Sequence, residues 1–579
     1  MSKLPAICAA RDIRFGANSY FDAWLYTVLI DNNIEYHMNT SLTASPEQVR
    51  FMVALETDQV YLPCSDSIFR LLLEEKKAPS LQSHYNRAWR IIVRLVRNVA
   101  VDTAERQRLL RFCRYRFRTY MDQHTIIPSR MVKRMTNIVF ALSEQDDPWF
   151  RQRSAANQKA HKFLHSALMQ GMLNAAPAGY LGEDILSMRH ELDHVELARL
   201  MYLAAMARPW LDTLPSPEEI RNGFTTALTT AAVTRDLLNA GEGTKIILFL
   251  VDADGGLVFD LAVVYRLMRM GHKVILALKG GFYFYAPTIR DAVTDPVLEQ
   301  YLDKGVVVED SAISKNRLLS LLREFRLVII SDGTRERLNL YRTSTTFARA
   351  WKEADLIMAK GWRNMDVLLG TSHEFTRDIL CFSINKAGAY DIRTKSHPPD
   401  VKKFSEQALI AKAEALIEAM RAARRQGKTV MFYSCIIGSI PGQVSTAIEL
   451  VQTFIARLRR KLADTYIVNP TEHFEDGLDG DDLMFMWERV QRSGYIDVWR
   501  FQTVEDIEAS FALLKRKVPP AWSGKDATYS TGCTKEMQIA MDMQARNGEM
   551  QIIGPAAEKF FRRSEYGVGK YSDVKIGGR

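Results

Sequence analysis

An acidic turn carrying two glycines interrupts the hydrophobic pattern in the middle of the chain, where the apolar run KIILFLV ends in Asp252-Ala253-Asp254-Gly255-Gly256. Carboxylate oxygens are the ligands that divalent cations prefer, and glycines leave backbone N–H groups open to an oxyanion. Two carboxylates one residue apart repel each other by about 1 kcal/mol at a protein surface unless a cation lies between them. We therefore expect Asp254 to point into a cleft, toward a metal or a lysine. The alternative is that it caps the following helix.

Charged residues also end three other apolar runs in the same part of the chain. Lys279 follows HKVILAL, Asp332 follows RLVIIS, and Lys360 follows DLIMA. Parallel strands bring their carboxyl ends to one edge of a sheet, and ligands bind at that edge. We expect these three side chains to converge with Asp252 on one cleft, where the lysines would act as point charges toward a phosphate group.

The hydrophobic pattern changes near residue 240. Residues 1–240 repeat apolar positions at the three-to-four spacing typical of helices, and Ser216 followed by Pro217 marks one helix start. Residues 241–400 alternate strand-length apolar runs with helical segments, which predicts a doubly wound parallel sheet with helices on both faces. Residues 401–579 show a second strand–helix series. We predict an α/β protein of three domains: a helical domain, a central α/β/α core and a smaller C-terminal α/β region.

Residues 240–395 resemble the metal-dependent damage-control phosphatases, also called the acidic-residue methyltransferase-like family. That family is marked by a strand ending in D-N-A-G-E, a V-F-D helix start, a K-G strand end, an N-D-A-T segment and, later, A-D-L-I-I-A-K-G. The matching positions in this chain are Asp252, Gly255, Val258-Phe259-Asp260, Lys279-Gly280, Thr288, Asp291 and, within ADLIMAKGWRN, Lys360, Gly361 and Asn364.

The resemblance implies a divalent cation, Mg²⁺, Mn²⁺, Co²⁺ or Ni²⁺, held by the first Asp, the Asn beside it and the Asp of N-D-A-T. By spacing, this chain has Asp252, Ala253 and Ala286 at those positions, and a glycine replaces the family's glutamate. A hard cation needs several oxygen ligands, so one carboxylate does not hold it well. A rebuilt metal site would combine Asp252 with Asp254 and Asp332.

The phosphate-facing positions match the family better than the metal ligands do. The resemblance implies catalytic roles for Asp252 and Lys360, and substrate contacts from Gly255, Lys279, Gly280, Gly361 and Asn364. It therefore implies a metal-dependent phosphatase-like hydrolase that acts on a small phosphorylated metabolite. The alternative is a catalytically degenerate domain that binds a phosphorylated ligand or a protein partner without turnover.

Two pairs of histidines have the i, i+4 spacing that places side chains on one face of a helix. His190 and His194 belong to an H-E-x-x-H sequence with Glu191, a pattern found in zinc hydrolases, and His161 and His165 repeat the spacing. The four histidines could share one metal ion. However, no further zinc-protease motif follows, and histidines on a polar helix face are commonly just solvated.

The formal net charge is +9 over 579 residues, and arginines are concentrated between Arg87 and Arg134. Arg111, Arg114 and Arg118 share one helix face, which could hold a polyanion. We do not expect nucleic acid as a partner, because no recognised nucleic-acid-binding motif accompanies the charge. The six cysteines form no CxxC pair and no apolar run reaches 18 residues, so we expect a cytoplasmic protein that does not enter membranes.

Overall fold

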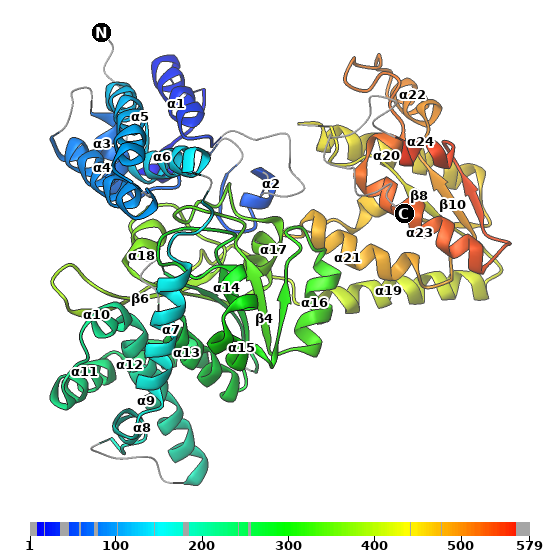
Figure 1. Cartoon of the computed structure of the whole chain (residues 1–579). Helices are drawn as coiled ribbons and strands as arrows, with labels where there is room; N and C mark the ends of the chain where they lie inside the picture. Colours follow the sequence, from blue (N-terminus) through cyan, green and yellow to red (C-terminus); the bar gives the residue numbers. More distant parts are fainter. Residues whose placement is uncertain are drawn as a thin grey trace. The chain divides into compact units, whose positions relative to one another are not determined.

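The computed structural model describes residues 9–16, 18–34, 44, 46–56, 59–74, 79–100, 102–143, 145–177, 184–240, 243–252, 256–440, 442–475 and 477–562 (Figure 1). The chain divides into two compact units, Met1–Pro399 and Asp400–Arg579, and each is described by itself. The helical residues before 240 and the α/β residues after them belong to the same unit. The predicted division of the chain into three domains therefore stays a prediction.

The first part of the first unit consists of helices that each bury one apolar stripe. One group packs around a shared core and comprises α1 (Ser19–Asp31), α3 (Asp66–Leu73), α4 (Pro79–Val99), α5 (Thr103–Gln123) and α6 (Pro128–Ser143). In α4, Tyr85, Ala88 and Ile92 face this core at the three-to-four spacing that a helix requires. The short elements η1 (Ala10–Asp12) and α2 (Pro46–Val49) belong to the same part of the chain.

A second group of helices follows, with α7 (Phe150–Leu164), α8 (Ala167–Leu173), α9 (Ile185–Ala205), α10 (Ala207–Asp212), α11 (Pro217–Thr229) and α12 (Ala231–Asn239). Ser216 caps α11 by accepting a hydrogen bond from the backbone N–H of Glu219, and Pro217 is the first helical residue. The helix start predicted from these two residues is confirmed.

Seven strands among the described residues form the sheet of the first unit, in the order β3-β4-β2-β1-β5-β6-β7. They are β1 (Ile246–Leu250), β2 (Lys273–Leu278), β3 (Gly305–Val308), β4 (Leu327–Ser331), β5 (Leu356–Lys360), β6 (Asp378–Ile384) and β7 (Tyr390–Lys395). Neighbouring strands are parallel except β6 and β7, which are antiparallel. At the centre of the sheet, Phe249 of β1 is in register with Leu276 of β2 and Met358 of β5.

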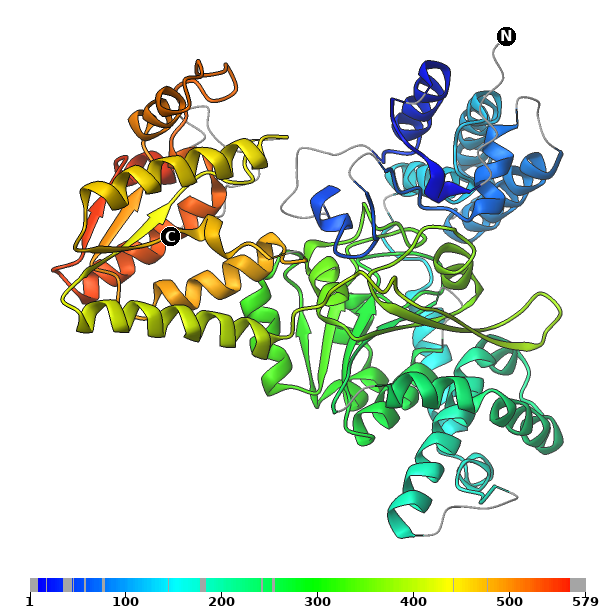
Figure 2. The ribbon, with the colours of Figure 1, turned by 180° about the vertical axis from the view of Figure 1, so that it is seen from behind.

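Helices cover both faces of this sheet (Figures 1 and 2). On one face α7 and α9 pack with α13 (Leu257–Arg269), α14 (Ile289–Thr294) and α15 (Pro296–Leu302). On the other face lie α16 (Lys315–Glu324) and α17 (Thr345–Glu353). The helix α18 (Trp362–Leu368) follows β5. In β1, Ile247 and Phe249 face the first layer, whereas Leu248 and Leu250 face the second, because successive strand residues point to opposite sides. These two apolar layers confirm the predicted doubly wound core.

The second unit has its own four-stranded parallel sheet, in the order β11-β10-β8-β9. Its strands are β8 (Thr429–Ser434), β9 (Thr465–Val468), β10 (Val498–Phe501) and β11 (Gln551–Ile553). Its helices are α19 (Glu406–Arg425), α20 (Val444–Lys461), α21 (Gly480–Gln491), α22 (Val504–Leu513), α23 (Thr531–Arg546) and α24 (Ala557–Phe561), with 3₁₀ turns η2 (Pro470–His473) and η3 (Ala527–Tyr529). The predicted smaller α/β region is confirmed.

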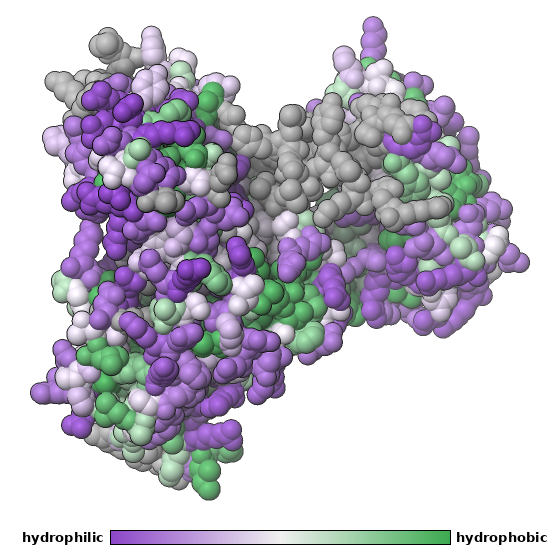
Figure 3. Space-filling model, in the orientation of Figure 1, coloured by the Kyte–Doolittle hydropathy of each residue, from purple (hydrophilic) through white to green (hydrophobic). Residues whose placement is uncertain are grey.

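Hydrophilic residues cover most of the face shown in Figure 3. Arg111, Arg114 and Arg118 are exposed on α5, and the Arg114 guanidinium lies 5.9 Å from the centre of the Trp89 ring. Within the described ranges, no helix combines the length and the apolar character needed to cross a membrane.

Candidate functional site

The four charged residues predicted to converge lie at the ends of four adjacent strands. Asp332, Lys279, Asp252 and Lys360 come at the carboxyl ends of β4, β2, β1 and β5, which are neighbours in that order. The chain leaves β1 through α13 on one face of the sheet and reaches β5 through α17 on the other. The ends of β1 and β5 therefore flank a topological switch point, the place where open α/β sheets bind ligands.

Asp252 and Gly361 are in close contact at this switch point. The Asp252 side chain is buried, and a β-carbon on Gly361 would lie 1.8 Å from its Oδ2 atom. Gly361 also has a φ of +93°, which disfavours any residue with a β-carbon. Asp252 Oδ1 lies 3.6 Å from Nη1 of Arg363. The glycine after the β5 lysine is therefore required for the carboxylate to occupy this position.

Lys360 is held inside the protein by an ion pair with Asp260, in the first turn of α13. Its Nζ donates to Asp260 Oδ1 at 2.6 Å, and both side chains are buried. Burial raises the pKa of Asp260 to about 6, although the lysine opposes that rise. Asn364 ties the two strand ends together, because its Nδ2 donates to the carbonyls of Val251 at 3.0 Å and of Lys360 at 2.8 Å.

Lys279 and Asp332 form a second buried ion pair, with Nζ 2.6 Å from Oδ2. Lys279 Nζ also donates to Thr334 Oγ1 at 3.0 Å, and Asp332 Oδ1 accepts from the backbone N–H groups of Thr334 at 2.8 Å and Gly280 at 3.3 Å. The Asp332 carboxylate is thus held by Lys279 and Gly280 after β2 and by Thr334 of its own loop. Its predicted role as a metal ligand stays a prediction.

Four residues outside the predicted site, Tyr283, Arg337, Trp362 and Arg363, complete the surroundings of these pairs. The half-buried Tyr283 ring lies 5.5 Å from Lys279 Nζ, and its pKa, raised by burial, is also raised by Asp252. Trp362 is 40% exposed and lies 4.9 Å from the guanidinium carbon of Arg363 and 5.7 Å from that of Arg337. The strand ends are therefore bordered by an aromatic ring between two arginines. Only Trp362 and Arg363 had a sequence signal, since they fall within the quoted GWRN segment.

The structure describes only Asp252 and Gly256 of the acidic turn. Ala253, Asp254 and Gly255 lie outside the described residues, so the predicted positions of Asp254 and Gly255 stay predictions. The helix α13 begins after Gly256, which has a φ of +78°. Across the described ranges, no group of three His, Cys, Asp or Glu side chains is arranged to hold a metal ion.

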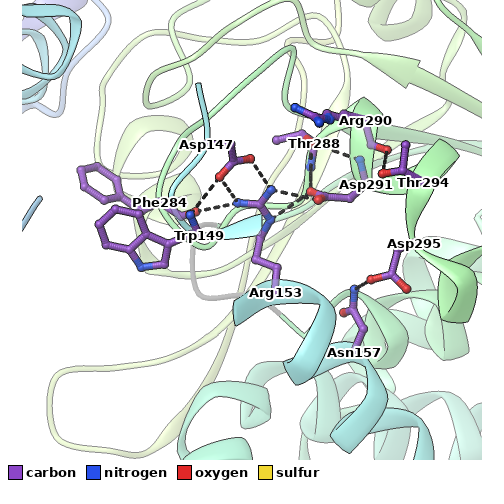
Figure 4. A network of polar contacts seen from close by, with 10 residues as sticks. All are labelled: Asp147, Trp149, Arg153, Asn157, Phe284, Thr288, Arg290, Asp291, Thr294 and Asp295. Atoms are coloured by element: carbon purple, nitrogen blue, oxygen red, sulfur yellow. Dashed lines mark hydrogen bonds and ion pairs between the residues drawn. The ribbon is translucent and has the colours of Figure 1, made fainter. Parts of the chain in front are cut away.

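Asp291, which matches a family position, has a structural role in this chain (Figure 4). Arg153 of α7 donates to Asp291 from Nε at 3.0 Å and from Nη2 at 2.9 Å, and it also pairs with Asp147. The backbone N–H and Oγ1 of Thr288 donate to the same Asp291 carboxylate at 2.7 and 2.9 Å. This network fastens α7 of the helical region to α14 of the core. Ala286, which by spacing matches the metal-binding Asp of the N-D-A-T segment, is fully buried.

The two histidine pairs have separate partners. His161 Nδ1 and His165 Nε2 each lie 2.9 Å from the Tyr301 hydroxyl, whereas His190 and His194 contact each other with 3.3 Å between their Nε2 atoms. Glu191 of the H-E-x-x-H sequence forms an ion pair with Arg235. Burial lowers the pKa of His194 to about 4. The described residues thus form no four-histidine cluster.

Comparison with known proteins shows what the central region is similar to. Residues 212–394 match the family model of the damage-control phosphatase ARMT1-like domain. A DUF89 family protein from Pyrococcus horikoshii of known crystal structure is similar, with 17% sequence identity and a TM-score of 0.37, over 53% of this chain and 96% of that one. No curated protein matches the chain. Residues 212–394 include the switch point, both buried ion pairs and the acidic turn, and this part of the chain is similar to the damage-control phosphatase ARMT1-like domain.

Proposed function

We propose that this domain binds a small phosphorylated metabolite at the carboxyl ends of β1 and β5 and hydrolyses its phosphate ester. The observation that carries the proposal is the position of Asp252, buried at the switch point against Gly361 and 3.6 Å from Arg363. A residue without a β-carbon lets ligand atoms approach a strand end closely, which is how glycines serve at phosphate sites.

Two cations at the end of β5 and the start of α18, Lys360 and Arg363, are suited to a phosphate group. Lys360 is fixed by Asp260, so its charge is already oriented before a ligand arrives. The Arg363 side chain is 29% exposed and lies over Trp362, so its guanidinium remains accessible for bidentate contact with phosphate oxygens. Positive charge held in place in this way stabilises the negative charge that develops on phosphoryl oxygens during ester cleavage.

A divalent ion would supply Lewis-acid polarisation of the phosphoryl oxygen and an activated water. Asp252 alone does not fit such an ion, because a hard cation requires several oxygen ligands. Asp332 is engaged by Lys279 and Thr334, and no described set of three candidate ligands exists. We propose Asp252 and Asp254 as the ligands; the residues described around Asp252 provide no others.

A second candidate function is binding of a phosphorylated ligand without turnover. It is favoured by the engagement of the other carboxylates: Asp332 is paired with Lys279, Asp260 with Lys360 and Asp291 with Arg153. Each of these acids has a cationic partner inside the protein. A site whose carboxylates are paired with cations could retain a phosphate group and still lack the means to activate water.

A phosphatase screen of the full-length chain with Mg²⁺, Mn²⁺, Co²⁺ and Ni²⁺ separates the two functions. We compare the wild type with Asp252→Asn and with Asp291→Asn, a control that also neutralises a buried carboxylate facing an arginine. Metal-stimulated turnover that Asp252→Asn abolishes, and that the folded fraction of Asp291→Asn keeps, supports hydrolysis. Thermal stabilisation by phosphorylated metabolites without turnover supports binding. If the protein shows no turnover and no thermal stabilisation by phosphorylated metabolites, both proposed functions are contradicted.

A further inference from the structure

A second charged pocket lies between the helical region and the α/β core of the first unit. Four of its lining residues come from α6, namely Lys133, Thr136, Asn137 and Phe140, and the others are Phe282 after β2 and Arg335 after β4. Phe282 and Arg335 belong to the loops that carry Lys279 and Asp332, so the pocket adjoins the strand-end site without sharing its charged residues.

Positive charge in this pocket exceeds negative charge. Arg335, Arg130 and Arg342 each lower the pKa of Lys133, whereas Glu336 raises it. The Glu336 carboxylate is itself occupied, because both of its oxygens accept hydrogen bonds from Arg130 Nη1 at 2.8 Å.

Neither Lys133 nor Arg335 forms an ion pair with any residue in the described part of the chain. Burial, together with the three arginines, lowers the pKa of Lys133 to about 8. Crowded cations of this kind are costly unless an anion joins them.

The polar groups around this charge also have unused hydrogen-bonding capacity. Thr136 is 5% exposed, lines the pocket, and its hydroxyl has no hydrogen-bond partner among the described residues. A buried hydroxyl without a partner costs free energy, which a ligand oxygen would recover. The Asn137 side chain adds an amide donor at the exposed rim.

Apolar contacts define the remaining wall. The Phe140 and Phe282 rings meet edge to face with 4.9 Å between their centres, and Phe282 also packs on the buried Trp149 ring at 5.3 Å. Gly281 provides the floor under Arg335, since a β-carbon there would lie 2.5 Å from Arg335 Nε. The pocket is thus a cationic recess with hydroxyl and amide donors and an aromatic wall.

We propose that this pocket is a second oxyanion-binding site, which takes a phosphate-class group through Lys133, Arg335 and the Thr136 hydroxyl. A phosphate group supplies several acceptor oxygens and two negative charges, matching the uncompensated cations and the unused donor. The oxyanion is either a separate ion or a second anionic group of the ligand at the strand ends. The proposal does not depend on hydrolysis.

Calorimetric titration of inorganic phosphate into the full-length protein tests the site. We expect Lys133→Met and Arg335→Gln each to weaken one phosphate-binding event by about tenfold to a hundredfold, since a charge-assisted hydrogen bond is lost. Thr136→Val, of equal size, should weaken it severalfold. The control is Arg134→Met: the guanidinium of Arg134 lies over the Tyr120 ring and donates to Asn33, so this variant removes a charge from α6 outside the pocket. Unchanged phosphate binding in both Lys133→Met and Arg335→Gln would overturn the proposal.

A hexose bisphosphate and a hexose monophosphate distinguish the two sources of the oxyanion. If one ligand spans both sites, the bisphosphate binds once per chain and loses affinity in both Lys133→Met and Lys360→Met, while the monophosphate responds to Lys360→Met alone. If the pocket takes a separate ion, inorganic phosphate binds at two sites and each variant removes one. Both outcomes support the pocket, and both remain measurable in a protein that shows no phosphatase activity.

Discussion

The two parallel sheets of this protein carry different chemistry at equivalent places. In the first unit the switch point lies between β1 and β5 and is lined by charged groups, with Asp252 beside Arg363 and Lys360 paired with Asp260. In the second unit β8 also has its sequence successor β9 on one side and β10 on the other, so its carboxyl end is an equivalent switch point.

Polar groups at the end of β8 are hydrogen-bonded to one another, and Asp506, to which Tyr433 of β8 donates, is paired with Arg500. The indole N–H of Trp499 donates to Ser434 Oγ at 2.8 Å, and Cys533 Sγ donates to the Cys435 carbonyl at 3.3 Å. Glu536 accepts from Gln491 at 2.9 Å, and burial raises its pKa to about 7. The connectivity offers the same location in both sheets, but the side chains differ: Asp252, Arg363 and the Lys360–Asp260 pair lie at the first, whereas the Arg500–Asp506 pair lies beside hydrogen-bonded neutral groups at the second. Function follows the side chains at the strand ends rather than the sheet topology.

The largest expected effect concerns the buried lysine at the first switch point. Lys360→Met leaves Asp260 buried without its partner and should lower the free energy of unfolding by about 3–5 kcal/mol. Lys315→Met is the matched control, because Lys315 forms a buried ion pair with Glu353 at 2.7 Å, away from the strand ends. We expect thermal melting to show a similar loss in both, and phosphate-ester binding to disappear only in Lys360→Met. Equal binding by the two variants would mean that Lys360 is not an anion contact.

A smaller effect is expected from Gly361→Ala. The added methyl would lie 1.8 Å from Asp252 Oδ2 in a backbone with a φ of +93°. Overpacking and left-handed strain together should cost about 2–4 kcal/mol in urea unfolding. Gly388→Ala is the control, since its φ is +83° and nothing lies within 4 Å of the added carbon. It should cost about 1–2 kcal/mol from backbone strain alone. Equal losses would show that Asp252 does not occupy the position described.

The free energy of unfolding of the second unit should depend on pH because its buried Glu536 carboxyl group holds a proton. The folded pKa of Glu536 is raised to about 7 from an ordinary value of 4.5, so the folded state holds the proton more tightly. The stabilisation is full below pH 4.5 and is lost as the pH rises through 7. Glu536→Gln should flatten the dependence of melting temperature on pH between 4.5 and 7. Glu549→Gln, at an exposed position, should leave that dependence unchanged. A wild-type slope retained in Glu536→Gln would contradict the assignment.

The smallest effect is expected from Arg363→Gln. Its guanidinium is partly exposed and 3.6 Å from Asp252, so its electrostatic contribution is screened by solvent. We expect phosphate-ester affinity to fall by about two- to fivefold, with little change in melting temperature. Arg393→Gln, which removes an exposed pair with Asp391 on β7, serves as the control. A loss as large as that in Lys360→Met would mean that Arg363, rather than the lysine, is the main anion contact.

Local sequence patterns predicted the elements of this fold but only part of the site. The apolar runs ending at Asp252, Lys279, Asp332 and Lys360 predicted four parallel strand ends on one edge, because strand length and burial on both faces leave a clear pattern. The pairing of these charges could not be predicted in the same way. Lys279 bonds to Asp332, 53 residues away, and Lys360 to Asp260, 100 residues away.

Residues that depend on packing between distant segments left no local signal. Arg130 of α6 meets Glu336 across 206 residues, and Arg153 of α7 meets Asp291 across 138. Neither arginine differs in sequence context from the many exposed arginines nearby. Their partners become evident only when the helical region is packed against the strand ends, which periodicity does not specify.

The most direct test of a phosphate site confined to the first sheet is a crystal structure of the full-length protein soaked in tungstate, an anomalously scattering analogue of phosphate. We predict an anomalous peak at the carboxyl ends of β1 and β5, within hydrogen-bonding distance of Lys360 or Arg363, and none at the carboxyl end of β8. A peak at the end of β8, or none at the ends of β1 and β5 while tungstate binds elsewhere, would contradict this assignment.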